Sequence, residues 1–252
     1  MSSLQFKVLA VSALALVSQL TLPRVASADS VNGLYLSDVN SATPSVTFGG
    51  GNYQVGFTST PGTSISSAGL AFTPADLGFP NLAGFVIPAN SQVPAILINN
   101  GLVPSALGGL LPGEILLHPG NASDGSASPP ISDAVIQFTA PTAGTYNIDG
   151  DFRALPDNNS TTDSVFINGI ADFTAVSSLT PSVFTLNNVS LNAGETVDFD
   201  VAGILNGGNV DSESTGFSAN VTATPLPKSL GAGLALLALV PLATKHRRPT
   251  SA

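Results

Sequence analysis

Hydrophobic and polar positions alternate with a period of two through the second half of the chain. The clearest stretch is Tyr146 to Phe152, where Tyr146, Ile148 and Phe152 share one face and the opposite face is polar. This pattern is typical of a β-strand with one buried face, and a slip of one residue would expose the whole apolar set. The sequence therefore specifies both the strand and its register.

Similar segments recur along the chain, separated by turns rich in glycine and proline. In the second half we expect strands at Ala134–Phe138, Tyr146–Phe152, Ser164–Asn168, Val183–Val189, Thr196–Val201 and Phe217–Ala223. Two earlier segments, 46–48 and 53–57, flank three glycines and predict a hairpin. Because the strands each have one polar face, the pattern predicts an all-β fold, an antiparallel two-sheet sandwich of the jelly-roll kind.

The segment 71–120 is apolar but has no clear period. Its seven prolines prevent any long regular element. We expect only short strands there, at 84–87, 95–98 and 114–117. The sandwich is expected to occupy 29–224 and to be clearest over 117–223.

The first 28 residues have the pattern of a secretory signal peptide. Lys7 precedes an apolar run at Val8–Leu20, and Ala26-Ser27-Ala28 supplies small residues before the expected cleavage point. We expect an apolar signal helix that signal peptidase removes, which leaves Asp29 as the first residue of the body.

The end of the chain contains a second apolar segment, followed by a basic cluster. A helix over 229–244 would be about 24 Å long at ~1.5 Å per residue, short of the ~30 Å hydrocarbon core of a membrane. Lys228 and the basic stop would reach the two interfaces and let this transmembrane helix span. The basic stop consists of Lys245, His246, Arg247 and Arg248. Because basic residues favour the cytoplasmic side, we expect the body outside the cytoplasm, with a transient anchor in the inner membrane.

A proline motif, Pro225-Leu226-Pro227, stands directly before this helix and opens the segment 225–252. Together, the motif, the apolar helix and the basic end resemble the PEP-CTERM sorting signal of Gram-negative bacteria, in a variant with leucine between the prolines. The resemblance implies cleavage by an exosortase, a membrane protease, and delivery to the cell surface or to an extracellular biofilm matrix. A GPI signal is the alternative, but its hydrophobic tail ends the chain without a basic cluster.

The body is strongly acidic once both signals are set aside. All 16 acidic residues lie between Asp29 and Glu213, and Arg153 is the one Lys or Arg left to oppose them, which gives a net charge of −15. Such a surface repels phosphate backbones, so no nucleic-acid partner is expected. The chain has no cysteine, and its core or a bound metal must stabilise the fold without disulfides.

The order of strand and turn motifs in the body carries a second resemblance. The motifs are LHPG at 117–120, AVIQFTAPTAGTYNIDGDF at 134–152, TTDSVFING at 161–169, LNAGETVDFDV at 191–201 and ESTGFSANVT at 213–222. They resemble the bodies of PEP-CTERM cargo proteins, which are similar to carbohydrate-binding-module sandwiches. The resemblance implies a sandwich that binds sugars, and it makes Glu213, where relatives often carry aspartate, a candidate contact.

Carboxylates and amides are concentrated over 147–163, and hard cations such as calcium prefer several oxygen ligands. Asn147, Asp149 and Asp151 share one strand face, and the loop that follows is rich in similar side chains. The candidate metal ligands are Asp149, Asp151, Asp157 and Asp163, and the candidate ligand-binding residues are Asn158, Asn159 and Glu213. The alternative is a solvated strand face followed by Asx turns. We likewise expect Asp198 and Asp200 to face solvent.

No catalytic motif stands out. His118 is the only histidine between the two signals, and the Pro119-Gly120 pair after it favours a turn-capping role. Neither Gly-x-Ser-x-Gly nor His-Glu-x-x-His occurs, and no carboxylate pair is marked by divergent environments. We therefore expect no enzyme. A secreted glycan hydrolase, which needs only two carboxylates, is the less favoured alternative.

Together these observations predict an exported, exosortase-processed cell-surface or extracellular-matrix protein. Its role is expected to be structural or interactive and non-catalytic, in association with exopolysaccharide. The alternative is a calcium-dependent, lectin-like carbohydrate-binding module. The chain has no tryptophan and three tyrosines, so the lectin interpretation depends on loop carboxylates and amides instead of aromatic platforms.

Overall fold

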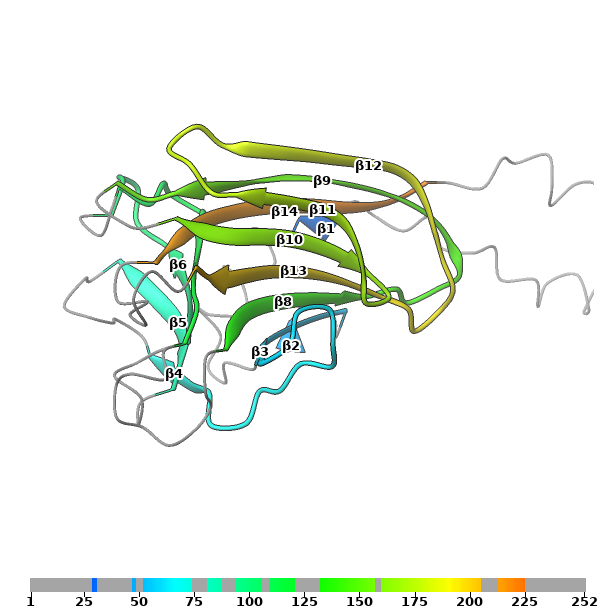
Figure 1. Ribbon diagram of the computed structural model, residues 1–252, viewed down its shortest axis with the longest axis horizontal. Coiled ribbons are helices and arrows are strands. Elements are labelled where there is room, and N and C mark those ends of the chain that lie inside the picture. The colour runs from blue at the N-terminus through cyan, green and yellow to red at the C-terminus, as the bar shows by residue number, and fades with distance from the viewer. Residues whose placement is uncertain are drawn as a thin grey trace, which may run out of the picture.

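The described part of the chain is built of β-strands. The computed structural model describes residues 29–30, 47–48, 52–73, 81–87, 94–105, 109–120, 132–156, 160–204 and 213–224. Within these ranges there are fourteen strands and no α-helix (Figure 1). Two antiparallel sheets lie face to face, which confirms the all-β sandwich that the alternating pattern predicts.

Sheet A has eight strands, in the order β12, β9, β14, β7, β6, β5 and β4, with β1 paired to β14 beyond the end of β7. Its strands are β1 (Asp29–Ser30), β4 (Ala71–Thr73), β5 (Leu82–Val86), β6 (Ala95–Asn99), β7 (Ile115–His118), β9 (Gly144–Ala154), β12 (Ser182–Leu191) and β14 (Thr215–Thr224). The short strands β5, β6 and β7 occur in the proline-rich segment close to where they are expected.

Sheet B has six strands, in the order β11, β10, β13, β8, β3 and β2. Its strands are β2 (Thr47–Phe48), β3 (Tyr53–Thr58), β8 (Asp133–Thr139), β10 (Thr161–Ile167), β11 (Ile170–Val176) and β13 (Thr196–Gly203). The hairpin of β2 and β3 confirms the prediction from the glycine turn.

Strand β11 is an addition that the sequence prediction missed. Asn168 and Gly169 join it to β10 with φ angles of 50° and 78°. Positive φ at both central residues is the geometry of a type I′ hairpin, for which Asn-Gly is the preferred pair. In the sequence, the Asn168-Gly169 dipeptide is the signal that could have predicted this hairpin.

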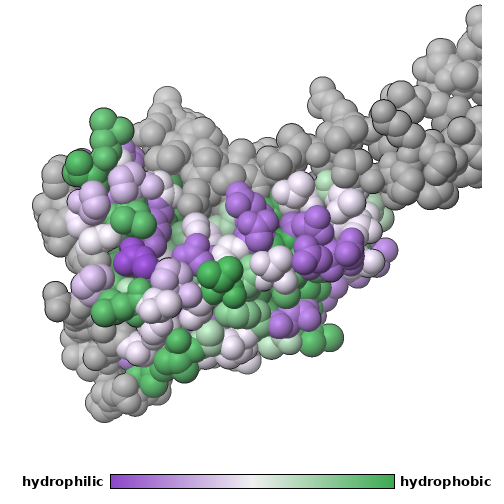
Figure 2. All heavy atoms as spheres, turned by 90° about the horizontal axis from the view of Figure 1, so that it is seen from above, coloured by the Kyte–Doolittle hydropathy of each residue, from purple (hydrophilic) through white to green (hydrophobic). Residues whose placement is uncertain are grey.

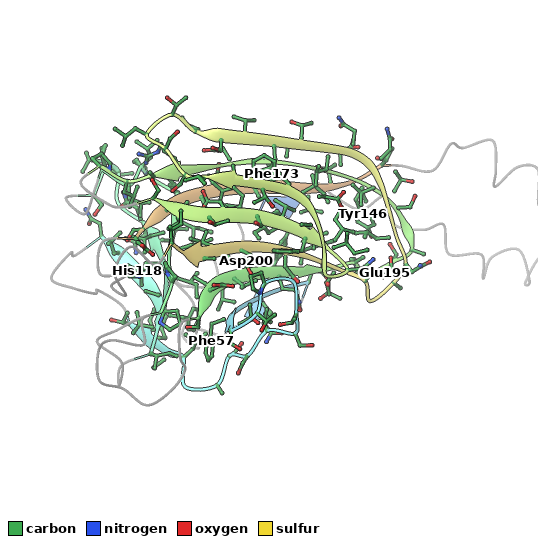
Figure 3. The ribbon with its side chains drawn as sticks, in the orientation of Figure 1. Phe57, His118, Tyr146, Phe173, Glu195 and Asp200 are labelled. Carbon is green, nitrogen blue, oxygen red and sulfur yellow. The ribbon has the colours of Figure 1, made fainter. Side chains whose placement is uncertain are left out.

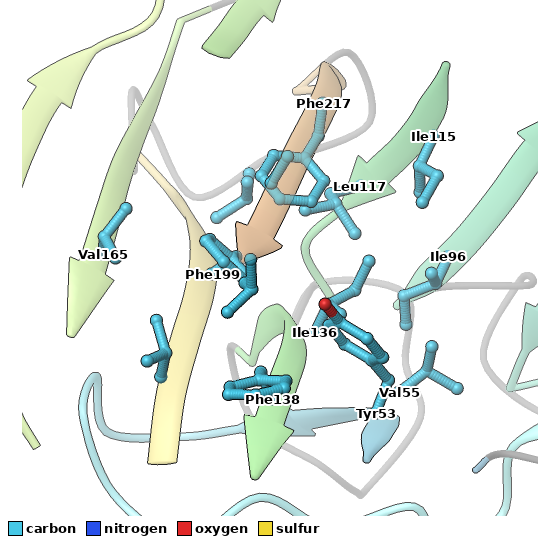
Figure 4. Close-up of a cluster of buried hydrophobic side chains, with 14 of the residues drawn as sticks. Tyr53, Val55, Ile96, Ile115, Leu117, Ile136, Phe138, Val165, Phe199 and Phe217 are labelled. Atoms are coloured by element: carbon cyan, nitrogen blue, oxygen red, sulfur yellow. The ribbon is translucent and has the colours of Figure 1, made fainter. Parts of the chain in front are cut away.

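The main core lies between the sheets. Figure 4 shows side chains of both sheets meeting there, with Phe217 and Ile115 from sheet A and Phe199 and Ile136 from sheet B. The ring centroid of Phe217 is 5.1 Å from that of Phe199 and 5.1 Å from that of Phe152. Such ring pairs add about 0.5–1.5 kcal/mol each to the burial of their surface.

A second apolar cluster covers the opposite face of sheet A. It contains Leu82, Val86, Ala95, Leu97, Leu110, Leu116 and Leu155. All residues of β5 and β6 are therefore buried, because their alternate side chains enter different clusters. This explains why segment 71–120 is apolar without a period of two.

The outer face of sheet B is crossed by residues 59–70, the segment between β3 and β4, which we call the cover loop. At one end Ser66 exchanges two backbone hydrogen bonds of 2.8 Å with Phe57. At the other end a Cβ on Gly62 would collide with the Phe166 ring and the Gly169 carbonyl oxygen. Glycine at position 62, which also has a φ of 70°, thus lets the loop reach the β10–β11 turn.

The expected signal helix at 1–28, the motif at 225–227, the apolar helix at 229–244 and the basic stop at 245–248 lie outside the described residues. In the part of the chain that the structure describes, no helix has the length and apolar character needed to cross a membrane.

Candidate ligand pocket and buried carboxylates

A polar pocket of about 340 Å³ lies between the cover loop and the outer face of sheet B. It is lined by Gln54, Gly62, Thr63, Ser64, Ile65, Gln137, Asn168, Gly169, Thr196 and Asp198. Among these described lining residues, Asp198 is the one charged side chain, and Ile65 is the one large apolar residue.

Three side chains from three strands form the row across the pocket. Gln54 of β3 pairs with Gln137 of β8, and Gln137 pairs with Asp198 of β13 on its other side. In directly opposed positions of antiparallel strands, Cβ atoms are about 4.5–5.5 Å apart, so the side chains lie next to one another. Their sequence neighbours Val55, Ile136 and Phe199 point into the core, and the alternation of strand residues therefore turns this row outward.

The hydrogen bonds of the row leave acceptors facing the pocket. Gln137 Nε2 donates to Asp198 Oδ1 at 2.8 Å, and Gln54 Nε2 donates to Ser67 Oγ at 2.9 Å. Ser67 Oγ in turn donates to the carbonyl oxygen of Val55 at 2.6 Å. Within the described chain, no hydrogen bond uses the side-chain oxygen of Gln54 or Gln137, so both are available to a ligand.

The far wall of the pocket is the β10–β11 turn. Asn168 Oδ1 accepts a hydrogen bond of 3.0 Å from the backbone N–H of Thr196, and Asn168 N–H donates to the Thr196 carbonyl oxygen at 3.0 Å. The turn is thereby fixed to the start of β13. This wall of the pocket is therefore joined to sheet B by two hydrogen bonds.

Carboxylates are buried on this same face, contrary to the expectation that Asp198 and Asp200 face solvent. Asp198 is 3% exposed and Asp200 is 1% exposed, since this face of sheet B is covered and not open to water. Burial raises the pKa of Asp133, the first residue of β8, to about 7. Burial also raises the pKa of Asp198, against a smaller lowering effect of its hydrogen bond from Gln137. The pKa of Asp200 is raised well above its usual range, first by burial and then by repulsion from Asp133, Asp198 and Asp163.

Asp200 lies in the middle of sheet B, on β13, well away from His118 (Figure 3). His118 Nδ1 donates to the carbonyl oxygen of Pro119 at 2.7 Å, in line with the turn-capping role expected from the sequence. The pocket therefore has no histidine among its described lining residues, and it has a single carboxylate. Hydrolysis of a glycosidic bond ordinarily needs two carboxylates on opposite sides of the bond.

Asp163 occupies the interior between the sheets. It opposes the core residue Val201 on β13 and accepts hydrogen bonds at Oδ1 from Thr161 Oγ1 at 2.6 Å and Thr215 Oγ1 at 3.4 Å. Its Oδ2 has no hydrogen-bond partner in the described chain. Burial raises the pKa of Asp163 to about 7, although the bonds from Thr161 and Thr215 act to lower it.

Glu213 is also fully buried, just before β14. Neither of its carboxylate oxygens has a well-formed hydrogen bond within the described chain. Burial raises the pKa of Glu213 to about 7, with a smaller lowering effect from the backbone of Ile204. Because Thr215 contacts Asp163, the two buried carboxylates belong to the same end of the sandwich.

Three of the four candidate metal ligands lie in the described residues, and the structure does not bring these three together. Asp149 and Asp151 lie on the outer face of sheet A, where they accept hydrogen bonds from Asn220 and Ser218, respectively. Asp163 instead points between the sheets from sheet B, because its strand pairs into a different sheet. Asp157, Asn158 and Asn159 lie outside the described residues.

Calcium fits the donor chemistry of Asp163 and Glu213, since both have buried oxygens without partners and calcium takes oxygen ligands. Calcium usually takes six to eight such ligands. Across the described ranges, no group of three or more His, Cys, Asp or Glu residues is arranged to hold a metal ion.

The side of the molecule that carries β12 is seen in Figure 2. Hydrophilic and hydrophobic side chains alternate in small patches there, without one continuous apolar area.

The pocket residues Gln54 and Gln137 are not among the candidates predicted from the sequence. The available signal was their position on the polar face of an alternating strand, which is shared by many solvated residues.

No protein-family model and no curated protein matches the sequence. Among solved structures, the chain is similar to the CBM36-1 domain of a multidomain xylanase from the hindgut metagenome of Trinervitermes trinervoides, with 14% identity, 43% of this chain and 88% of that chain covered, and a TM-score of 0.27. It is also similar to a CBM36 in complex with calcium and xylotriose, with 17% identity, coverage of 44% and 79%, and a TM-score of 0.25.

A third similar structure is the GH26-CBM35 β-(1,4)-mannanase of Podospora anserina, with 12% identity and a TM-score of 0.28. Here 69% of this chain is covered, and the chain spans 29% of the mannanase. At these identities and TM-scores the likeness carries no functional argument.

Proposed function

We propose that this protein is an exported, non-catalytic module that binds polysaccharide through the polar pocket on sheet B. The observation that carries the proposal is the row of Gln54, Gln137 and Asp198 beneath the cover loop. Sugars present hydroxyl groups on all sides, and amides, carboxylates and hydroxyls are the side chains that form hydrogen bonds with them. The pocket volume of about 340 Å³ is at the lower end of the usual range for small ligands, which suits one or a few sugar rings.

Two other ligand classes fit the pocket less well. The described lining residues include no lysine or arginine, the side chains that bind phosphate most strongly. They also include little apolar surface, which a lipid would require. The single carboxylate supports binding without hydrolysis.

The boundaries of the sandwich support the proposal of export. Strand β1 begins at Asp29, directly after the expected signal-peptide cleavage, and β14 ends at Thr224, directly before the Pro225-Leu226-Pro227 motif. The two strands pair with each other, so both ends of the body are secured by the same sheet. We infer that signal peptidase and an exosortase-type protease trim the chain at these boundaries and deliver the body to the cell surface or an extracellular polysaccharide matrix.

Calcium is a second proposed ligand, with a stabilising role apart from the pocket. The orphaned oxygens of Asp163 and Glu213 support it, because a bound cation would neutralise carboxylates that otherwise carry a buried charge. In the sequence, Asp157, Asn158 and Asn159 stand a few residues before Asp163.

Titration of the purified protein with the producing cell's own extracellular polysaccharide tests the proposed function. Saturable binding is expected, and Gln54→Ala and Gln137→Ala should each weaken it about 2- to 10-fold, the range for one hydrogen bond. Asn220→Ala, on the outer face of sheet A, is the control and should leave the affinity unchanged. Binding that ignores both pocket substitutions would place the site elsewhere, and no binding would reject the proposal.

Repeating the titration with added calcium or a chelator separates the second ligand from the first. A stabilising ion should raise the melting temperature without being required for sugar contact. Equal melting temperatures in both conditions would rule against calcium.

A further inference from the structure

The pocket differs from an ordinary hydroxyl-binding site in the sign of its charge. Asp198 lines it, and Asp200 follows two residues later on the same face of β13. Asp133 lies on the neighbouring strand, but burial raises the pKa values of Asp133 and Asp200, so Asp198, the carboxylate that lines the pocket, is the group that gives it a negative charge. No cation in the described lining residues offsets these groups.

The body's only Lys or Arg side chain is already engaged on the other sheet. Arg153 of β9 donates to Glu114 Oε2 at 2.6 Å and to Glu114 Oε1 at 3.2 Å. It is therefore not available to neutralise the pocket. Because Coulomb interactions strengthen in a partly buried, low-dielectric site, this pocket favours cations and opposes anions.

The hydrogen bonds within the row of Gln54, Gln137 and Asp198 leave the pocket with a preference for ligands that donate hydrogen bonds. Gln137 holds one oxygen of Asp198 with its N–H group, and the side-chain oxygens of Gln54 and Gln137 remain as acceptors. These groups need a ligand that donates several hydrogen bonds. An ammonium group has three donors and no acceptor, and its bond to a carboxylate is stronger than that of a neutral hydroxyl.

We propose that the pocket selects a sugar residue with a free ammonium group, as in a de-N-acetylated hexosamine polymer. The inference rests on the proposed function and names its ligand class. It follows from the cavity, the acceptor row and the absence of a basic side chain among the described lining residues. Polysaccharides rich in uronic acids are excluded by the same argument, since their carboxylates would meet Asp198.

A matched pair of oligosaccharides tests the proposal. The probes are β-1,4-linked hexasaccharides of glucosamine and of N-acetylglucosamine, which share length and linkage and differ in the amino group. Calorimetric titration of the purified protein at about 0.15 M salt limits long-range attraction to the acidic surface. The glucosamine probe should bind about tenfold or more tightly, as expected for one charge-assisted hydrogen bond.

Two variants that each remove one negative charge test whether Asp198 causes the preference for glucosamine. Asp198→Asn keeps an acceptor for Gln137 and should abolish the preference for glucosamine. Asp172→Asn removes an exposed carboxylate on β11, away from the pocket lining, and should retain it. Circular dichroism melting of each variant shows whether the fold is kept.

Each remaining outcome has a defined meaning. Equal affinity for the two probes would overturn the ammonium preference and leave polysaccharide binding standing, whereas failure of both probes and of the native polysaccharide would overturn the proposed function too. A preference that falls equally in both variants would show non-specific attraction and contradict a pocket site. Equally tight, Asp198-dependent binding of a hexalysine peptide would show that the pocket recognises the cation without the sugar.

Discussion

Replacing Asp163 by asparagine tests how the sandwich interior responds to a buried charge. The carboxylate is fully buried, and burial raises its pKa from 3.8 to about 7. Between these values the folded protein still holds a proton that the unfolded chain has released. Raising the pH through this window therefore favours unfolding, and stability that is present in acid is lost toward neutral pH.

The magnitude follows from the width of the window. About three pH units at ~1.4 kcal/mol per unit give ~4 kcal/mol, which the folded protein loses between about pH 4 and pH 8 through this group. Asparagine retains an oxygen that can accept the hydrogen bond from Thr161 but carries no charge. Between pH 4 and pH 8, the unsubstituted protein should therefore lose ~4 kcal/mol of unfolding free energy relative to the Asp163→Asn variant.

Urea denaturation in the presence of chelator measures the shift. Circular dichroism is the suitable signal, since the chain has no tryptophan. Asp172→Asn is the control, because its exposed carboxylate should change the gap by less than about 0.5 kcal/mol. A gap that stays constant from pH 4 to pH 8 would refute the reasoning. If calcium binds at Asp163, adding it at pH 8 should stabilise the unsubstituted protein and not the variant.

Three further predictions concern packing, pairing and processing. Gly150→Ala should destabilise the fold by about 1–3 kcal/mol, because the added Cβ would overlap the Phe184 ring. Gly144→Ala is the control. Its Cβ would have its nearest heavy atom 3.8 Å away, so the loss of stability in the same urea titration should be far smaller. Arg153→Met should cost about 3–5 kcal/mol by leaving the Glu114 carboxylate buried without its partner, and the double variant with Glu114→Gln should recover part of that loss in thermal melts. Intact mass of the surface form should show a chain without the C-terminal sorting signal, and a mass that includes the basic stop would contradict processing.

The alternation of apolar and polar residues determined much of the fold in advance. Tyr146, Ile148 and Phe152 face the core as the period of two requires, and the Asn168-Gly169 pair contained the signal for the hairpin that was missed. Local sequence suffices there, because side-chain direction in a strand and turn geometry both depend on neighbouring residues. The local sequence does not predict strand register in segment 71–120. Apolar clusters pack on both faces of sheet A there, so consecutive residues are apolar and no period of two is seen.

The candidate site was decided by tertiary structure. Gln54, Gln137 and Asp198 are far apart in sequence and meet because β3, β8 and β13 are adjacent in sheet B. The sequence predicts that Asp198 faces solvent and that Asp163 belongs to a polar loop, yet both are buried. A period of two tells which residues leave the core side of a strand. Whether that other side meets water, a covering loop or the opposite sheet depends on segments distant in the chain, and this contact sets both the pocket and the raised pKa values.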